Sequence, residues 1–439
     1  MSTRTIQPPP RHAGARPSAL ARGRTMLDDP VVGNALIMVL TTLLMAGAGT
    51  TFWIVVARLA QPAQVGVAST LVTAAEALGF FAQLGLNVSL LRSMSHSTRP
   101  ASDVTTASLV VALAGVALAV AYAGVVPSLS PGVARALDWS VVPVFALLVA
   151  ATAVNQLTDS LFLALDRVRA NLWVNGVLTG TVRMAVPFAL AGAGAFRIFG
   201  VLGATSVLAA GASIAVILHR LPDRPSLRPS PGFGSARGLA AAGYVVNGLL
   251  ITPQLVLPLI VINTMGAALN AVFFISFQVA NLLNHAVYTV GNAMYAEAER
   301  TTAAPRAVTR RGARTMAAAV VLGAGTVVLA APLLLAVFGA RYADAGAPAL
   351  RLLALGASGV ALNYWAAMRL RLTASGRTMV LAQLISTGLT LAGVAWGAPH
   401  GLTGVALGWW LGQSAGGAIA LLLTRLAQDR SPYDRKVHG

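Results

Sequence analysis

Three ionisable side chains, Glu76, Asp159 and Arg183, lie inside long apolar runs of the sequence. An ionised group near the centre of a bilayer costs about 2.5–3.5 kcal/mol, so each needs an opposite charge or water. An ion pair between Asp159 and Arg183, which lie in consecutive runs, would lock two helices together. Alternatively, Arg183 binds an anionic headgroup, and Asp159 is the partner that Arg183 exchanges for that headgroup. Glu76 has no cationic partner in its own run, and is either a protonatable coupling site or a neutral, hydrogen-bonded carboxyl group.

Two of the apolar runs carry mostly polar side chains at spacings of three and four, which place them on one face of a helix. The first set is Ser69, Thr73, Glu76, Phe80, Gln83 and Asn87, and the second is Gln278, Asn281, His285, Tyr288, Asn292 and Tyr295. Hydrogen bonding between helices is one explanation. We favour a hydrated cavity, because each set lies in the second apolar run of its half of the chain, so that two equivalent helices carry polar faces. The cavity candidates are Glu76, Gln83, Asn87, Asp159, Arg183, Gln278, Asn281, His285, Tyr288 and Asn292.

The sequence contains no motif of a nucleotide-dependent or metal-dependent enzyme. Walker A, HExxH, GxSxG and glycine-rich nucleotide-binding patterns are absent. The sequence has no cysteine, and His285 has no second ligand at a metal-binding spacing, so it is interpreted as a hydrogen-bonding member of its face. We predict no enzyme, no catalytic residue, no cofactor and no metal site.

The composition requires a lipid environment for these residues. Of 439 residues, 56% are hydrophobic and 10% charged, with a mean hydropathy of +0.73, whereas soluble domains carry about 25% charged residues. A membrane-spanning helix needs about 20 mostly apolar residues, and continuous runs of this length exclude a barrel. We therefore predict an all-α polytopic membrane protein with about twelve transmembrane helices, at 35–57, 65–90, 104–126, 139–165, 172–193, 198–218, 244–265, 271–295, 315–338, 347–368, 378–397 and 401–424.

A polar, proline-rich stretch divides these helices into two lobes of six. The predicted organisation is a disordered cytoplasmic tail at 1–30, an N-terminal lobe at 31–218, a cytoplasmic linker at 219–240, a C-terminal lobe at 241–425 and a cytoplasmic tail at 426–439. Two such halves suggest repeats around an axis along the membrane normal, with a substrate path between them.

The net charge of +18 is spread over short loops, which argues against nucleic acid as a partner. Twelve spans place 25 basic residues on one side of the membrane and five on the other. By the positive-inside rule, both termini are predicted to be cytoplasmic. The basic residues are nearly all arginine, which suggests a GC-rich bacterial genome and hence a bacterial cytoplasmic membrane.

Several passages resemble the polysaccharide transport branch of the multidrug/oligosaccharidyl-lipid/polysaccharide (MOP) flippase superfamily, which contains the Wzx-type flippases. They are ARLAQPAQVG from Ala57, LGLNVSLLR ending at Arg92, FGARYADAGAPALRLLAL from Phe338 and GLTGVALGWWLGQ from Gly401. The resemblance covers nearly the whole chain after the N-terminal tail. It implies two six-helix lobes around a central cavity that the second and eighth helices line.

The resemblance also implies a function, which is the movement of polyprenyl-pyrophosphate-linked sugars to the outer leaflet by alternating access. Arg183 is the best match to the basic cavity residues that face the pyrophosphate, ahead of Arg58 and Arg92. The implied partners are the polyprenyl-linked glycan, the lipid bilayer and a polysaccharide polymerase or ligase. The alternatives are a small-molecule exporter of the same superfamily and an integral-membrane glycosyltransferase or polymerase. Short loops on the predicted outer face, with Asp138 and Asp344 as their acids, argue against the enzyme.

Overall fold

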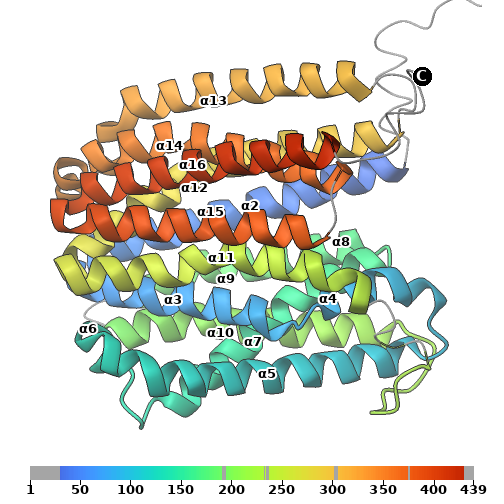
Figure 1. The fold of residues 1–439 in the computed structure, drawn as a ribbon. Helices are drawn as coiled ribbons and strands as arrows, with labels where there is room; N and C mark the ends of the chain where they lie inside the picture. The colour runs from blue at the N-terminus through green and yellow to red at the C-terminus, as the bar shows by residue number, and fades with distance from the viewer. Residues whose placement is uncertain are drawn as a thin grey trace, which may run out of the picture.

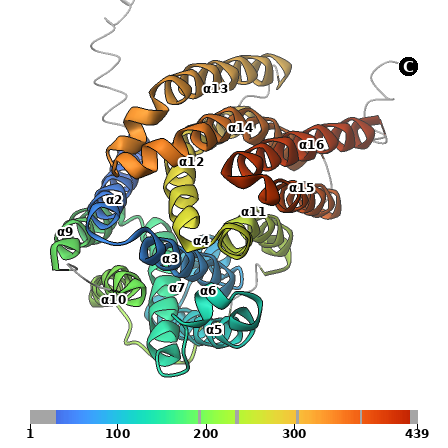
Figure 2. The ribbon, with the colours of Figure 1, turned by 90° about the vertical axis from the view of Figure 1, so that its left-hand side faces the viewer.

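The computed structural model describes residues 30–189, 194–231, 233, 237–300, 305–373 and 376–429, and all its regular elements are helices. The tail predicted at 1–30 and the end of the tail predicted at 426–439 therefore lie outside the described residues, apart from Pro30 and 426–429. The long helices run side by side (Figure 1), and the first and second halves of the chain form two lobes (Figure 2).

The first lobe contains five long helices and several short pieces. The long helices are α2 (Pro30–Leu59), α3 (Pro62–Ala82), α5 (Pro100–Leu129), α7 (Val142–Ala164) and α10 (Ala195–His219). The short pieces are α4 (Leu86–Ser93), η1 (Met94–His96), α6 (Pro131–Ala134), α8 (Val168–Asn171), η2 (Leu172–Thr179), α9 (Gly180–Ala185) and η3 (Val186–Ala189).

The second lobe is built from six long helices and one short turn. They are α11 (Arg237–Met265), α12 (Ala267–Arg300), α13 (Pro305–Ala336), α14 (Ala340–Thr373), α15 (Gly376–Gly397), η4 (Ala398–His400) and α16 (Gly401–Asp429). We call the side on which α2 begins and α16 ends the terminal side (Figure 1). The opposite, distal side carries the turns near residues 60–61, 130–141, 266, 337–339 and 398–400.

Ten segments of the described chain are long and apolar enough to cross a membrane. One of them, Gly376–Arg425, contains both α15 and α16. The fifth predicted span is not among the ten, and its residues are divided among η2, α9 and η3. The prediction of an all-helical, two-lobed membrane protein is confirmed.

The second predicted span is wrong as one continuous helix over 65–90. Helix α3 ends at Ala82, and Leu84 and Gly85 have φ angles of 50° and 76°, in the left-handed region that favours glycine. The hydroxyl of Tyr244 in α11 donates to the Phe81 carbonyl oxygen at 2.6 Å. The chain then resumes as α4, so residues after the break leave the face that α3 presents.

The fifth predicted span is irregular along its length. Residues Leu172–Thr179 form a π-helical segment, and Pro187 lies in the closing 3₁₀ turn Val186–Ala189. Segments of π-helix occur frequently at functional sites. This segment precedes α9, which carries Arg183.

The second lobe is held together by close approach of α15 and α16. A Cβ atom added at Gly408 would lie 2.0 Å from the Gly393 carbonyl oxygen, and one added at Gly397 would lie 2.0 Å from the Gly404 carbonyl oxygen. Glycines spaced by four residues, at positions 404, 408, 412 and 416, form the contact line on α16. Such small residues let helix backbones approach closely where no hydrophobic effect drives association.

The chain between the lobes folds back onto the first lobe. The Asp223 carboxylate accepts hydrogen bonds from the backbone N–H groups of Ala101 at 2.8 Å and Ser102 at 3.3 Å, at the start of α5. The buried Asp103 carboxylate accepts from the backbone N–H and hydroxyl of Ser230, both at 2.7 Å. The bonds to Asp223 satisfy donors that the N-terminus of α5 leaves free, and the bonds to Asp103 hold Ser230 of the connecting segment against α5.

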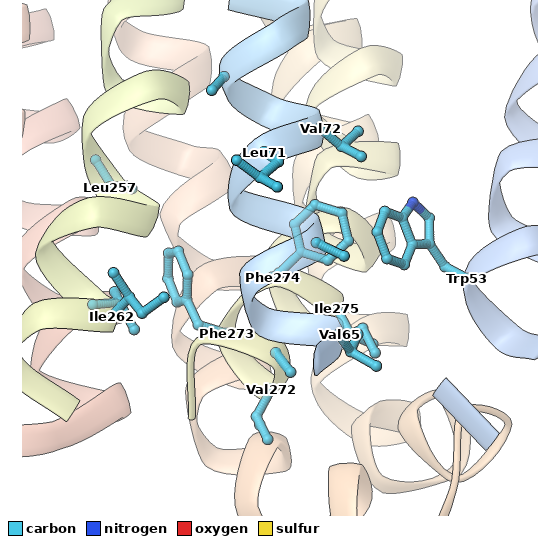
Figure 3. Close-up of a cluster of buried hydrophobic side chains, with 14 of the residues drawn as sticks. Trp53, Val65, Leu71, Val72, Leu257, Ile262, Val272, Phe273, Phe274 and Ile275 are labelled. Carbon is cyan, nitrogen blue, oxygen red and sulfur yellow. The ribbon is translucent and has the colours of Figure 1, made fainter. Parts of the chain in front are cut away.

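The two lobes meet through a shared apolar core. Figure 3 shows Trp53 from α2 and Leu71 from α3 facing Leu257 from α11 and Phe273 and Phe274 from α12. The Trp53 and Phe274 ring centroids are 4.6 Å apart. This core lies beside the cavities that contain the predicted charged residues.

Candidate functional site

Two adjoining cavities lie between the lobes and within the first lobe. The first, of about 340 Å³, is lined mainly by α3, α7, α9 and α10 and by Gln254 of α11. The second, of about 210 Å³, is lined mainly by α2, α3, α9 and α12, with Leu202 of α10. Both are lined by Met45, Glu76, Arg183 and Leu202. Glu76 and Arg183 therefore lie where the two cavities join, and we call the joined space the chamber.

Arg183 reaches the chamber from the short helix α9. Its Nη1 atom lies 4.0 Å from the position of a Cβ added at Gly49 of α2. Its Nε atom is buried and has no hydrogen-bond partner in the described part of the chain. A buried, unpartnered donor on a cation is costly, so Arg183 Nε is free to donate to a ligand or to water.

Glu76 is exposed to the chamber and lies within electrostatic range of Arg183. Within the described residues, the two side chains form no ion pair at 4.0 Å or less. The Glu76 backbone carbonyl, rather than its carboxylate, accepts a hydrogen bond from Gln156 Nε2 at 3.0 Å. A carboxylate and a guanidinium group thus face the chamber without bonding directly to each other.

Asp159 lines the first cavity but does not pair with Arg183. Its Oδ1 atom accepts a hydrogen bond from Asn175 Nδ2 at 3.0 Å, and the same nitrogen donates to Asn171 Oδ1 at 2.6 Å. The ion pair that the sequence allowed is absent among the described residues. The partner of Asp159 is instead Asn175, which lies in the π-helical segment.

Helix α12 supplies the neutral wall of the chamber. Gln278 and His285 are exposed to the second cavity, and Asn281 lines it while accepting a hydrogen bond from Asn284 Nδ2 at 3.1 Å. Tyr288 is half-buried and lines none of the cavities described above, and its ring centroid lies 5.0 Å from that of Tyr364. The side chain of Asn292 lies outside the described residues.

Two predicted residues of the first stripe do not reach the chamber. Gln83 is buried, and its Nε2 atom donates to Gln156 Oε1 at 3.0 Å. Asn87 is half-buried in α4, beyond the break at Leu84 and Gly85, and its Oδ1 atom has no partner within the described residues. Neither residue lines the cavities described above. For Asn87 the reason is the break, because the periodicity assumed one unbroken helix.

Gln156 and Gln254 also line the site, although the sequence pattern did not predict them. Gln156 lines the first cavity and bonds to both α3 residues already named. Gln254 lines the first cavity and a third, smaller one of about 40 Å³ between α3, α11 and α12. Each is an amide side chain inside an apolar run, and this feature of the sequence could have indicated a cavity-lining residue. Among the described residues, no group of three or more His, Cys, Asp or Glu side chains could hold a metal ion.

No family model matches the chain, and no curated protein matches it. Solved structures do match it. An inward-facing MATE family multidrug resistance transporter of the MOP superfamily is 15% identical, over 88% of this chain and 96% of that chain, with a TM-score of 0.65. The same kind of transporter in an outward-facing conformation is 16% identical, over 92% and 97%, with a TM-score of 0.58.

The lipid II flippase MurJ, in an inward closed conformation, is 11% identical over 91% of this chain and 88% of that chain, with a TM-score of 0.70. Identities this low establish a common fold and nothing about substrates. The chain therefore has the fold of MOP superfamily transporters and flippases.

Proposed function

We propose that this protein moves a polyprenyl-linked oligosaccharide across the bacterial cytoplasmic membrane by alternating access, for cell-surface polysaccharide biosynthesis. The observation that carries the proposal is the placement of Arg183 and Glu76 where the two cavities join, opposite the amide and imidazole groups of α12. Polar groups at such depth are costly unless they serve a ligand, water or one another.

The chemistry of the chamber suits a headgroup with an anionic and a neutral part. A guanidinium group binds phosphate oxygens through paired N–H donors, and Arg183 has a donor without a partner in the described residues. Gln278, Asn281 and His285 offer donors and acceptors for sugar hydroxyls. The apolar tail would remain in lipid while the headgroup crosses inside the chamber.

The remaining organisation follows from the sequence pattern and is part of the proposal. The lobes at 31–218 and 241–425 would rock against each other, joined by the linker at 219–240, with both termini in the cytoplasm. The likeness to a lipid II flippase supports a lipid-linked substrate. A polymerase or ligase would then use the glycan on the outer face.

A deletion strain and one substitution test the proposal. Deletion should leave lipid-linked repeat units facing the cytoplasm, and Arg183→Ala should lower glycan export by about tenfold or more, because a hydrogen bond to a charged group contributes about 1.5–3 kcal/mol. Arg197→Ala, at an exposed arginine of α10 that lines none of the cavities described above, is the control. Normal surface glycan in the deletion strain would contradict the proposal.

A second candidate is export of a cationic small molecule. Glu76 and Asp159 both line the first cavity, and two carboxylates beside one guanidinium group give this cavity acidic character. The likeness to multidrug transporters agrees with this alternative. It predicts that deletion increases sensitivity to cationic compounds while surface glycan stays normal, which is the reverse of the outcome expected for the flippase.

A further inference from the structure

On the distal side, α3 of the first lobe and α12 of the second approach each other at Gly66. A Cβ atom added at Gly66 would lie 1.8 Å from the Ala267 carbonyl oxygen and 3.1 Å from the Ala271 amide nitrogen. Cβ atoms essentially never approach another atom that closely. The two lobes can therefore close at this point only because residue 66 has no side chain.

A buried amide bridges the same point. Asn270 of α12 is 0% exposed, and its Nδ2 atom donates to the Gly66 carbonyl oxygen at 2.8 Å and to Thr70 Oγ1 at 2.9 Å. Its Oδ1 atom is buried without a partner in the described residues. Because an unpaired buried acceptor is costly, Asn270 would gain hydrogen bonds to water when the lobes separate. The Asn270 amide therefore stabilises the closed contact through its nitrogen and gains bonds to water through its oxygen when the contact opens.

Two other hydrogen bonds join the lobes on the distal side. Arg58 Nε, at the end of α2, donates to the Val337 carbonyl oxygen at 2.9 Å. Asn263 Nδ2, near the end of α11, donates to the Leu129 carbonyl oxygen at 2.8 Å. Both acceptors lie at or just beyond helix C-termini, where carbonyl groups lack helical partners and water can replace a side-chain donor. Their loss on opening is therefore readily compensated.

The exposure of α12 changes along its length. Residues 270–276 are all buried, whereas Gln278, Leu282 and His285 are exposed. The buried stretch contains Val272, Phe273, Phe274 and Ile275, which pack with α2, α3 and α11 (Figure 3). An apolar layer of α12 thus lies between Gln278 and the distal contact at Gly66 and Asn270.

From these contacts we infer that Gly66, Thr70 and Asn270 form the distal gate of the chamber, a latch that holds the lobes together on the side away from the termini. Separation of α3 from α12 at this point opens the chamber to the distal side. The inference rests on the alternating access of the proposed function. It does not depend on which substrate the chamber carries.

The absence of native cysteine allows a direct test in membrane vesicles of known orientation. Gln278→Cys places one thiol in the chamber, and a membrane-impermeant maleimide is applied to one side at a time. Adding Gly66→Ala should raise labelling from the distal side by about tenfold or more, because overpacking at the latch shifts the equilibrium between closed and open states. Labelling from the terminal side should fall.

Gly124→Ala is the matched control. Gly124 lies near the distal end of α5, and a Cβ added there has nothing within 4 Å, so labelling should equal that of the parent protein. Equal labelling of the Gly66→Ala and Gly124→Ala proteins on both sides would overturn the gate.

A cross-link covers the case in which the Gly66→Ala protein does not fold. In a Thr70→Cys, Asn270→Cys protein that retains Gln278, oxidation should lock the latch and abolish transport, and reduction should restore it. Full transport by the cross-linked protein would overturn the gate. If Gly66→Ala shifts the labelling but Arg183→Ala leaves glycan export unchanged, the gate stands and the proposed role of Arg183 is wrong.

Discussion

The tight packing of α15 on α16 predicts that a glycine-to-alanine substitution lowers the free energy of unfolding at the contact but not at an open position. At Gly408 an added Cβ atom would lie 2.0 Å from the Gly393 carbonyl oxygen, 2.4 Å from the Gly393 carbonyl carbon and 2.9 Å from the Val394 amide nitrogen. These are backbone atoms, so no side chain can rotate away. A methyl group at residue 408 can enter only if the two helices move apart.

The magnitude follows from two opposing effects. Replacing glycine by alanine inside a helix stabilises it by about 1 kcal/mol where the site is open. Overpacking in a well-packed core costs about 1–3 kcal/mol, and displacement of a helix also loosens the neighbouring contacts at Gly397 and Gly404. We expect Gly408→Ala to lower the free energy of unfolding by about 1–3 kcal/mol.

Gly388→Ala in α15 is the control, because a Cβ added at Gly388 has nothing within 4 Å. We expect this substitution to leave the protein unchanged or up to about 1 kcal/mol more stable. The assay is thermal unfolding of the detergent-purified protein, followed by loss of the monodisperse peak in size-exclusion chromatography. Equal midpoints for the Gly408→Ala and Gly388→Ala proteins would refute the close approach of these helices.

Two further predictions concern buried polar groups. Asp103→Ala should destabilise the first lobe by about 1–3 kcal/mol, because it leaves the buried N–H and hydroxyl donors of Ser230 and the half-buried hydroxyl of Ser97 without their acceptor; Asp138→Ala, at an exposed carboxylate, is the control, and equal thermal midpoints for the two proteins would contradict this account. Asn363→Ala should cost about 1–2 kcal/mol, because Asn363 Nδ2 donates to Ser386 Oγ at 2.7 Å and Gln413 Oε1 at 2.9 Å, and an unchanged midpoint would show that these bonds add no stability.

Much of the fold was accessible from the sequence because a bilayer imposes simple requirements. Helix length, apolar composition and the polar interruption at 219–240 were enough to predict an all-helical protein of two lobes. The polar face of α12 could also be predicted as far as Asn281 and His285, because α12 is one continuous helix and the spacing of three and four residues keeps these side chains on one face. Tyr288 lies on the predicted face, yet its ring packs toward Tyr364.

The partners of the charged residues were not accessible from the sequence. Sequence proximity suggested Asp159 for Arg183, but the charged neighbour of Arg183 is Glu76, from a helix three spans earlier. The π-helical turn that gives Asp159 an amide partner leaves no signature in apolar periodicity. The same limit applies to Asn87, because the left-handed turn at Leu84 occurs at a residue type that seldom adopts it.

The irregular segments of the first lobe and its charged residues occur together. Arg183 follows a π-helical segment, and Glu76 lies in the last two turns of α3 before the break at Leu84 and Gly85. Non-helical backbone at membrane depth is tolerated only where it is buried in protein or lines a hydrated cavity. The π-helical segment leads directly into α9, which brings Arg183 to the chamber.

The second lobe contributes neutral side chains from the unbroken helix α12 and is held by backbone contact between α15 and α16. A displaced helix there would disturb the contacts along the whole line of α16 glycines, from Gly404 to Gly416. Arg183 and Glu76 both belong to the first lobe, so a ligand that changes their interaction would act first on that lobe. The second lobe would respond as one body, and the latch at Gly66 and Asn270 is where the two would separate.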